Sequence, residues 1–245
     1  VKAGAAILHI HARDDQGLNT METTRMVEVV TKIREALAAN NLDAVINVTT
    51  SGTKFPEDMR VAHLPILKPE MCSYDPGTLN WANSYVFLNT PPFLERLGDI
   101  TQELDIKPEL EIFDAGMLGN VEYYVKKGKL QAPLHYQLVL DVPGGMPGTI
   151  DSVNYLSFLS SKLPEGSTWS ITGIGKGAMP CMLAGLAAGC DGIRVGLEDN
   201  VFLKKGVHAT NAQLVEQAIA LGKMANREIA TAQETRELLG LTKKV

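Results

Sequence analysis

Apolar and β-branched residues recur along this chain in short runs, separated by intervals that leave room for a helix. Each run tends to end in polar residues or glycine, and a helical stretch follows it. Seven runs predict strands, with the sequences AAILHIHA, DAVINVTT, PEMCSY, PELEIFDAG, LHYQLVLDV, TWSITGIG and GIRVGLED. Strands that alternate with helices are typical of a parallel sheet covered by helices.

Three of the intervening segments carry the spacing or the end signals of helices. TTRMVEVVTKIREAL has apolar residues at helical spacing and a predicted N-cap at Thr23 or Thr24. NAQLVEQAIALGKMANREIA repeats this pattern, with Asn211 as the predicted cap. TAQETRELLG places Thr231 and Glu234 at the spacing of a capping box.

The number of strands favours a barrel. Seven βα units, preceded by VKAGAA, which looks like the last turn of a helix, fit a (β/α)8 TIM barrel better than the doubly wound sheet that is also compatible with them. We expect one α/β domain over residues 1–245, with the first strand and most of the first helix of the barrel absent from this sequence. On this view the natural protein has about 35 to 40 further residues upstream, because an eight-stranded barrel requires them.

Composition and charge narrow the class of function. Of 245 residues, 45% are hydrophobic and 21% are charged, which is ordinary for a globular protein with a sizeable core. No stretch of about 18 unbroken apolar residues predicts a membrane span, so we expect a cytoplasmic protein. A net charge of -5 without a clustered basic stripe argues against a nucleic-acid surface and favours small-molecule chemistry. Cys72, Cys181 and Cys190 lack CxxC spacing and predict buried, reduced thiols.

The first predicted strand carries two histidines two positions apart, His9 and His11. Alternate residues of a strand project from the same face, so both imidazoles point to one side of the sheet. Two such imidazoles can each give one nitrogen to Zn²⁺, but a catalytic zinc usually has a third protein ligand and an open position. From the spacing alone, a metal site and a pair of core histidines stay equally open.

The last predicted strand adds a carboxylate that could complete such a site. In GIRVGLEDN, a straight strand would place Arg194 and Glu198 on one face and Asp199 on the other. In a closed eight-stranded barrel only the missing strand separates this strand from the histidine pair, so Glu198 can approach the imidazoles. Arg194 would keep an acidic cluster ionised. The alternative is a solvated group of charged side chains at a strand end.

Hydroxyl and glycine residues follow several strands. Four hydroxyl residues lie where strands pass into loops, namely Thr49, Thr50, Ser51 and Ser73. They suit hydrogen bonding to a substrate carboxylate, although turn formation explains them equally well. TGIGKGAMP fits neither GxGxxG nor a P-loop, so its glycines are better explained by a loop that passes close to a ligand. His63, in a helical region, and His135, at a strand start, are not placed like ligands.

Several motifs together resemble those of the β-keto acid cleavage enzymes. They are HIHAR near the start, VTTSG and KPEMCS in the middle, GIGKGAMP later, and RVGLEDN, NAQLVEQA and REIATAQETRELLGL at the end. The resemblance covers essentially the whole chain, and HxHxR and RVGLEDN are its most specific parts. It implies a zinc-dependent (β/α)8 barrel that converts a β-keto acid and acetyl-CoA into acetoacetate and a new acyl-CoA. It also implies a homotetramer.

The resemblance implies roles for individual residues as well. The implied zinc ligands are His9, His11 and Glu198. Arg194 and Asp199 match the pair that handles the proton. Thr49 and Ser73 match the hydroxyl residues that contact the keto acid, and Thr49 stands where the family has serine.

Two other functions stay open. A zinc-dependent TIM-barrel hydrolase also uses an HxH strand, but such sites usually add histidines from later strands, and neither His135 nor His208 is convincingly at a strand's C-terminal end. A non-catalytic barrel that binds zinc and small acids has no need of Arg194 and Asp199 beside the metal. The sequence does not name the keto acid. Residues that could select its tail are Tyr74, Asp75 and Lys176.

Overall fold

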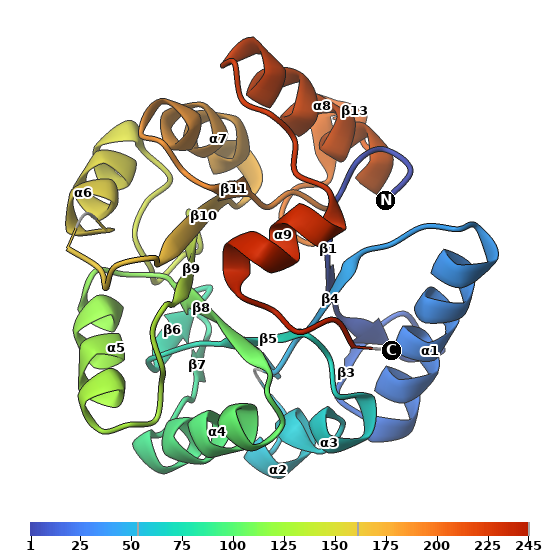
Figure 1. Ribbon diagram of the computed structural model, residues 1–245. Coiled ribbons are helices and arrows are strands. Elements are labelled where there is room, and N and C mark those ends of the chain that lie inside the picture. The colour runs from blue at the N-terminus through green and yellow to red at the C-terminus, as the bar shows by residue number, and fades with distance from the viewer. Residues whose placement is uncertain (53, 161, 245) are drawn as a thin grey trace.

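The structure is a computed structural model that describes residues 1–52, 54–160 and 162–244. Its centre is a sheet of seven parallel strands in the order β1-β4-β5-β8-β9-β10-β11 (Figure 1). These strands span Ile7–Ile10 (β1), Val45–Val48 (β4), Met71–Tyr74 (β5), Lys107–Ile112 (β8), His135–Leu140 (β9), Thr168–Gly173 (β10) and Gly192–Ile193 (β11). The seven predicted strands and the α/β fold are therefore confirmed.

The sheet curls, and all the helices except α9 lie around its outside (Figure 1). The helices span Thr23–Ala39 (α1), Glu57–Val61 (α2), Leu64–Leu67 (α3), Pro91–Glu103 (α4), Gly116–Lys126 (α5), Ile150–Ser160 (α6), Ala178–Ala187 (α7), Asn211–Met224 (α8) and Ala232–Leu239 (α9), with a 3₁₀ turn at Gly175–Gly177 (η1). Within the described residues, β1 and β11 each pair with one neighbour only. The sheet is thus a half-barrel with two open edges.

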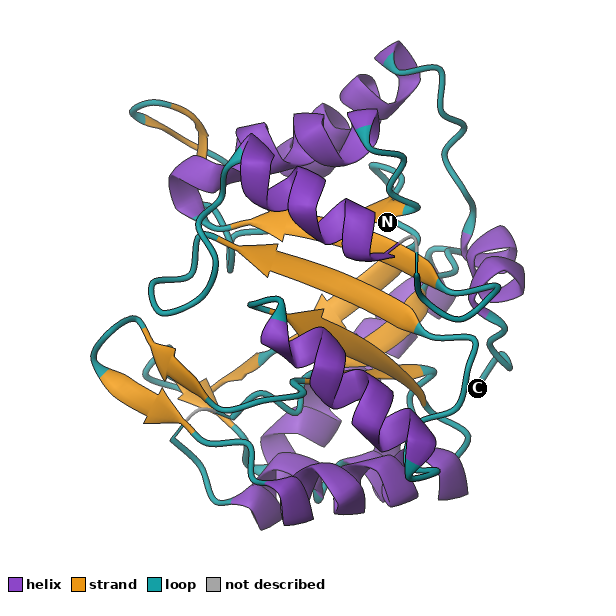
Figure 2. Ribbon diagram, turned by 90° about the vertical axis from the view of Figure 1, so that its left-hand side faces the viewer, coloured by secondary structure: helices purple, strands orange, loops and turns teal. Residues whose placement is uncertain are grey.

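Three short antiparallel hairpins interrupt the βα pattern. They pair Ala12–Arg13 (β2) with Asn19–Thr20 (β3), Leu79–Trp81 (β6) with Tyr85–Phe87 (β7), and Phe202–Lys204 (β12) with Val207–His208 (β13). Two hairpins project beyond the arrowheads of the sheet strands (Figure 2). They flank the end of the sheet where barrel enzymes build their active sites.

Two predicted helix caps are wrong. The N-cap of α1 is Glu22, which makes no side-chain cap hydrogen bond. The β2–β3 hairpin ends at Thr20, and the helix begins three residues later, so Thr23 is already helical. The N-cap of α8 is Thr210, whose hydroxyl accepts from the Gln213 N–H in a capping box. Asn211 instead accepts from the backbone N–H of Leu197 at 2.9 Å, which ties the start of α8 to the loop after β11.

The predicted capping box of the last helix is confirmed. The Thr231 hydroxyl accepts from the Glu234 N–H at 3.2 Å, and the Glu234 carboxylate accepts from the Thr231 N–H at 2.8 Å. These bonds satisfy backbone donors that a helix start otherwise leaves unpaired. They fix the point at which α9 begins.

The core fills both faces of the sheet. All six residues of β9 are buried, and so are all four residues of β4 and of β5. A strand that is buried on both faces, by helices outside and by the side chains of other strands inside, has a nearly continuous apolar sequence instead of alternating apolar and polar residues. The polar residues that interrupt these runs are therefore informative, and they lie mainly inside the curled sheet.

Helix α9 lies across the end of the sheet at which the strands begin (Figure 1). Leu239 packs there against Val45 and Met71. Arg236, only 3% exposed, donates to both oxygens of Asp43 at 2.7 and 3.0 Å and pairs with the equally buried Glu70. This ion-pair network holds α9 over the opening of the half-barrel.

We expect Arg236→Met to lower the free energy of unfolding by about 3–5 kcal/mol, because it leaves the buried Glu70 carboxylate without its charge partner. Lys243→Met is the matched control. Lys243 also pairs with Asp43, at 3.1 Å, but it is exposed and is expected to contribute no more than about 1 kcal/mol. Urea unfolding measures both variants. A loss below about 1 kcal/mol for Arg236→Met would contradict this role.

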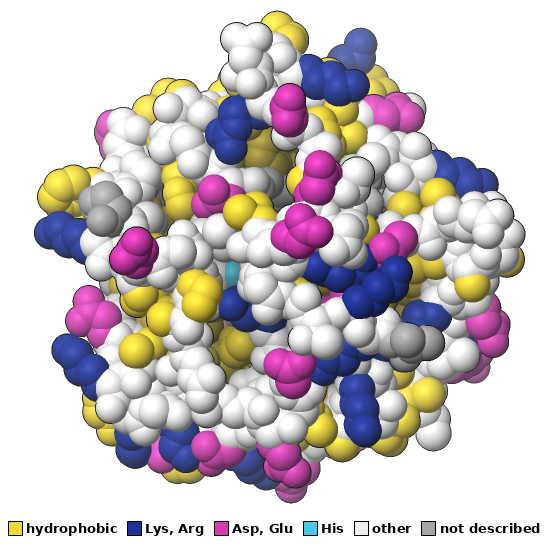
Figure 3. Space-filling model, in the orientation of Figure 1, with side chains coloured by type: hydrophobic (Ala, Val, Ile, Leu, Met, Phe, Trp, Pro, Cys, Tyr) yellow, Lys and Arg dark blue, Asp and Glu magenta, His cyan; other side chains and the backbone are white. Residues whose placement is uncertain are grey.

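The surface that carries α9 is chemically mixed. Acidic, basic and apolar side chains are intermingled on it, with a group of basic side chains near its centre (Figure 3). Among the described helices, none combines the length and the apolar content that crossing a bilayer requires.

Candidate active site

Polar side chains gather inside the half-barrel toward the C-terminal ends of its strands. The side chains of this cluster belong to residues within four neighbouring strands, namely His9 of β1, Asn47 of β4, Ser73 of β5, and Glu109 and Glu111 of β8. Register places His9 beside Asn47 and Ser73 beside Glu109 on neighbouring strands. Parallel pairing thus collects these groups from distant parts of the chain into one cluster.

The two histidines face each other through their Nε2 atoms, which lie 3.2 Å apart. The carboxylate of Glu198 reaches the same point, with its Oε1 atom 2.9 Å from His11 Nε2. Burial acts to raise the pKa of Glu198, but the hydrogen bond from His11 and the charge of Arg194 outweigh it and hold that pKa below its ordinary value. The carboxylate is therefore ionised beside two imidazole nitrogens.

The segment after β11 departs from the predicted straight strand. β11 ends at Ile193, and the chain turns so that the N–H groups of Asp199 and Asn200 donate to the carbonyl of Gly196 at 3.1 and 3.0 Å. The expectation that Asp199 faces away from Arg194 and Glu198 is therefore wrong. The turn brings all three side chains to the same side.

Arg194 contacts three carboxylates, two of which, Glu198 and Asp199, lie in this turn. Its Nε and Nη2 atoms donate to the two oxygens of Asp199 at 3.0 and 3.1 Å, and Nη2 also lies 3.1 Å from Glu198 Oε1. Its Nη1 atom donates to Glu111 Oε1 at 2.5 Å. Burial raises the pKa of Asp199 even though the Arg194 charge acts to lower it. A carboxylate of increased basicity thus lies directly beside Glu198.

Two glutamates of β8 complete the cluster, and neither was predicted from the sequence. Glu109 Oε2 lies 2.8 Å from His9 Nδ1 and accepts from the Asn47 amide at 2.7 Å. Burial acts to raise its pKa, but His9 outweighs burial and brings it to about 2. Burial and the nearby Asp75 carboxylate raise the pKa of Glu111 well above its ordinary value, although Arg194 opposes them.

A signal for these glutamates was present in the sequence. Glu109 and Glu111 stand two positions apart in PELEI, within a strand that is otherwise apolar. Like His9 and His11, two residues at alternate positions of a strand project from the same face. Carboxylates at alternate positions of a strand that is buried on both faces need partners inside the protein.

The four predicted hydroxyl residues lie together where β4 and β5 end. The Thr50 hydroxyl donates to the Ser73 carbonyl at 2.8 Å, and the Ser51 hydroxyl donates to Asp75 Oδ2 at 2.7 Å. Thr49 Oγ1 accepts from the Ser51 N–H at 3.0 Å, and Ser73 Oγ accepts from the Thr50 N–H at 2.8 Å. The protons of Thr50 and Ser51 are therefore engaged within the protein, whereas Thr49 and Ser73 act as acceptors in these bonds.

A protein-family model for the beta-keto acid cleavage enzyme matches residues 1–241. The chain is 38% identical over 244 residues to a 3-keto-5-aminohexanoate cleavage enzyme of Fusobacterium nucleatum subsp. nucleatum, covering 99% of this chain and 86% of that protein. The chain belongs to the β-keto acid cleavage enzyme family. It is also 33% identical over 264 residues to a 3-dehydrocarnitine:acetyl-CoA trimethylamine transferase of Rhizobium meliloti, covering 99% of this chain and 86% of that protein.

A solved structure supports the fold of this β-keto acid cleavage enzyme. The apo structure of ObcA superposes with a TM-score of 0.83 at 22% sequence identity. The match covers 98% of the present chain and 62% of ObcA, so the chain spans less than two thirds of that protein's length.

The described residues of this family member contain two groups of three side chains that could each hold a metal ion. One is His9, His11 and Glu198, and the other is His9, Glu109 and Glu111. In the first group the ligand atoms lie 3.2 and 2.9 Å apart. A tetrahedral zinc site with bonds of about 2.1 Å separates its ligand atoms by about 3.4 Å. The separations in the first group are shorter than this by a few tenths of an ångström, and its donors, two imidazole nitrogens and one carboxylate oxygen, are of the kinds that bind metal ions in proteins.

The other histidines and the thiols belong to neither of these two groups of candidate metal ligands among the described residues. His135, at the start of β9, lies 2.8 Å from the Thr168 hydroxyl. His63 is fully buried before α3, and burial lowers its pKa to about 4. The three cysteines are free and buried, as predicted.

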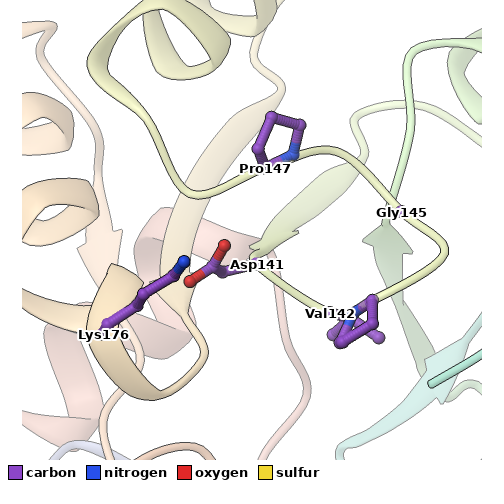
Figure 4. A pocket seen from close by; sticks show the side chains of 6 residues that line it. Asp141, Val142, Gly145, Pro147 and Lys176 are labelled. Carbon is purple, nitrogen blue, oxygen red and sulfur yellow. The ribbon is translucent and has the colours of Figure 1, made fainter.

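The glycines of TGIGKGAMP allow close backbone packing. A Cβ atom on Gly173 would lie 2.2 Å from the Gly177 carbonyl oxygen, so only glycine permits β10 and η1 to meet there. Lys176, within η1, lines a cavity of about 260 Å³ together with Asp141. The amine of Lys176 points toward the Asp141 carboxylate (Figure 4). The loop packs on itself as well as lining space that a ligand could occupy.

Proposed function

We propose that the chain is an acyltransferase that cleaves a β-keto acid with acetyl-CoA. The reaction is R–CO–CH₂–COO⁻ plus acetyl-CoA giving acetoacetate plus R–CO–S-CoA. The observation that carries this proposal is the turn after β11. It presents Glu198 to two imidazole nitrogens while Arg194 holds the more basic Asp199 beside them.

We assign His9 Nε2, His11 Nε2 and Glu198 as the ligands of a Zn²⁺ ion. In this assignment the Glu109 carboxylate accepts a hydrogen bond from the Nδ1–H of His9, which leaves Nε2 free for the metal and increases the basicity of the ring. The competing group around Glu109 and Glu111 is less favourable, because Glu111 is already bound to Arg194 at 2.5 Å. When bound, zinc supplies a Lewis acid that polarises a carbonyl oxygen of the substrate.

The residues around this site have separate roles. Asp199 removes a proton from the CH₂ carbon of the keto acid and so generates the carbon nucleophile. Arg194 orients Asp199 through two hydrogen bonds. Thr49 and Ser73 donate to the substrate carboxylate, and Thr50 and Ser51 shape the same wall with their protons engaged in the protein. Later steps pass the acetyl unit from CoA and the new acyl group to CoA.

We also propose that the half-barrel belongs to a closed eight-stranded barrel. Chain order and spatial order of the strands agree throughout the sheet, as they do in (β/α)8 barrels. Residues that follow the two edge strands meet, since His11 and Glu198 lie 2.9 Å apart. One further strand between β1 and β11 would pair both open edges.

The proposed function is tested with zinc-loaded protein and a panel of β-keto acids. With acetyl-CoA present, we expect acetoacetate and a new CoA ester to form in equal amounts. A zinc hydrolase would instead release free acids from esters or amides without CoA, and a metal-stabilised binding protein would bind zinc without turnover. Either of these two results would contradict the proposal.

Glu109→Gln is expected to weaken zinc binding by about 10- to 100-fold, because the neutral amide no longer supports the His9 ring as a carboxylate does. Competition with a chelator of known affinity measures this change. Glu35→Gln, at an exposed position of α1, is the control and should bind zinc as the unaltered protein does. Equal zinc affinity in both variants would remove Glu109 from the metal site.

A further inference from the structure

Arg60, in the short helix α2, is a buried cation, with only 2% of its surface exposed. Arg194 and Arg236, which are also largely buried, each bind carboxylates. Among the residues that the structure describes, none forms an ion pair with Arg60, whose nitrogens donate to carbonyl and amide oxygens instead. Burying an uncompensated charge is costly, so this cation indicates an anion that the described residues do not supply.

The surroundings of Arg60 hold its guanidinium in one orientation. Nη1 donates to the Leu88 carbonyl at 2.9 Å, and Nη2 donates to Asn89 Oδ1 at 2.6 Å. The ring centroids of Phe87 and Phe93 lie 5.1 and 4.2 Å from the guanidinium carbon. Aromatic faces at these distances attract a cation that has lost its water.

The remaining hydrogen bond of Arg60 reaches the hydroxyl wall of the candidate active site. Its Nε atom donates to the Thr50 carbonyl at 2.7 Å. That carbonyl belongs to the same peptide group as the Ser51 N–H, which donates to Thr49 Oγ1 at 3.0 Å. A cation on the carbonyl oxygen polarises the peptide group and strengthens the bond that its N–H donates. Thr49 Oγ1, which accepts this stronger bond, becomes a better donor of its own proton.

An anion bound at this wall would lie close to a carboxylate of the protein. Asp75 is 1% exposed, and its Oδ2 atom accepts from the Ser51 hydroxyl, whose oxygen lies 3.2 Å from Ser73 Oγ. Two carboxylates so close together repel each other in a buried site, unless a cation compensates them. The charges of Arg60 and Asp75 do interact, since Asp75 opposes the lowering of the Arg60 pKa that burial causes.

We propose that Arg60 is the positioning residue for the carboxylate of the β-keto acid, an inference that rests on the proposed function. Its charge compensates Asp75, so that a second carboxylate can bind nearby. Its bond to the Thr50 carbonyl holds and polarises the loop that presents Thr49. Arg60 acts through this loop, and Thr49 and Ser73 are the residues that contact the substrate.

Asn89→Asp tests this role without removing Arg60. The side chain keeps its size, but a carboxylate oxygen replaces the amide oxygen that lies 2.6 Å from Nη2, so the Arg60 charge becomes compensated. With zinc-loaded protein, calorimetry should show a Kd for acetoacetate about 10-fold or more higher. Methyl acetoacetate has the same keto group and no charge, so its Kd should not change. If Arg60 only stabilised the fold, the acetoacetate affinity would not change either.

The matched control is Asn89→Ser. Both Asn89 variants lose the bond that the Asn89 amide donates to the Gly77 carbonyl at 3.0 Å, but serine adds no charge. Asn89→Ser should therefore bind acetoacetate much more tightly than Asn89→Asp does. Equal weakening in the two variants would assign the effect to the lost bond and overturn the role of charge.

Arg60→Met removes the charge itself. Steady-state kinetics should show a KM for the keto acid about 10- to 100-fold higher, with a much smaller change in kcat, because the charge supports binding of a carboxylate that does not react. Arg96→Met is the control, since Arg96 also lies over the Phe93 ring, at 5.9 Å, and pairs with Asp58 of α2. It should leave this KM unchanged.

Circular dichroism checks that each variant folds, and Asn89→Asp decides the question if Arg60→Met does not. An unchanged acetoacetate affinity in Asn89→Asp, or an equal loss for acetoacetate and its methyl ester, would overturn the assignment. If acetoacetate binding changes as predicted but no β-keto acid is turned over, the role of Arg60 stands and the proposed function fails.

Discussion

Asp199→Asn is expected to lower kcat by about 10²- to 10⁴-fold while leaving zinc bound. Asparagine keeps the size of the side chain and one oxygen that accepts from Arg194, but it cannot remove a proton from the substrate. Glu198 and the two histidines keep their positions, since the turn after β11 is held by backbone bonds to Gly196. Steady-state kinetics and metal analysis of the same preparation measure both quantities.

The control for this variant is Asp151→Asn, which removes an exposed carboxylate from the first turn of α6. It should keep full activity. If Asp199→Asn retained more than about a tenth of kcat, Asp199 would not be the base. If Asp199→Asn lost its zinc together with its activity, the Asp199 carboxylate would be needed to hold the metal site together and would not be shown to act as the base.

His11→Ala is expected to lose both metal and activity. His11 Nε2 lies 3.2 Å from His9 Nε2 and 2.9 Å from Glu198 Oε1, so its removal takes away one of the three donors of the proposed ligand set. Loss of a Lewis acid that contributes several kcal/mol should lower kcat by about 10³-fold or more. Elemental analysis after dialysis, together with the activity assay, measures this outcome.

His208→Ala is the matched control for the metal measurement, because His208 stacks on Phe202 in the exposed β12–β13 hairpin. It should retain zinc at the level of the unaltered protein. Normal zinc content in His11→Ala would assign the metal to the alternative group of His9, Glu109 and Glu111.

The sequence predicted well what depends on local periodicity. The apolar runs located all seven strands, and the spacing of Thr231 and Glu234 located the start of α9. The spacing of His9 and His11 predicted that both imidazoles share a face, and their Nε2 atoms do meet. Each of these features is determined within a few residues of the chain.

The sequence predicted less well what depends on how the chain leaves a strand. Asp199 was placed on the wrong face because β11 ends at Ile193, five residues earlier than a straight strand through Glu198 would. Gly196, on whose carbonyl the turn closes, was the sign in the sequence that the strand could end early. The α8 cap was misassigned because Asn211 is engaged by Leu197, a contact made across the fold. The spacing of Glu109 and Glu111 could have predicted that both face the interior, but not that Glu109 pairs with His9, which lies 100 positions away.

The central claim is that this chain exchanges acyl groups between a β-keto acid and acetyl-CoA. Acetyl-CoA carrying ¹³C in its acetyl group, incubated with the zinc-loaded protein and an unlabelled β-keto acid, tests it most directly. We expect the label to appear in C3 and C4 of acetoacetate and the new acyl-CoA to be unlabelled. Label found only in free acetate, with no acyl-CoA formed, would contradict it.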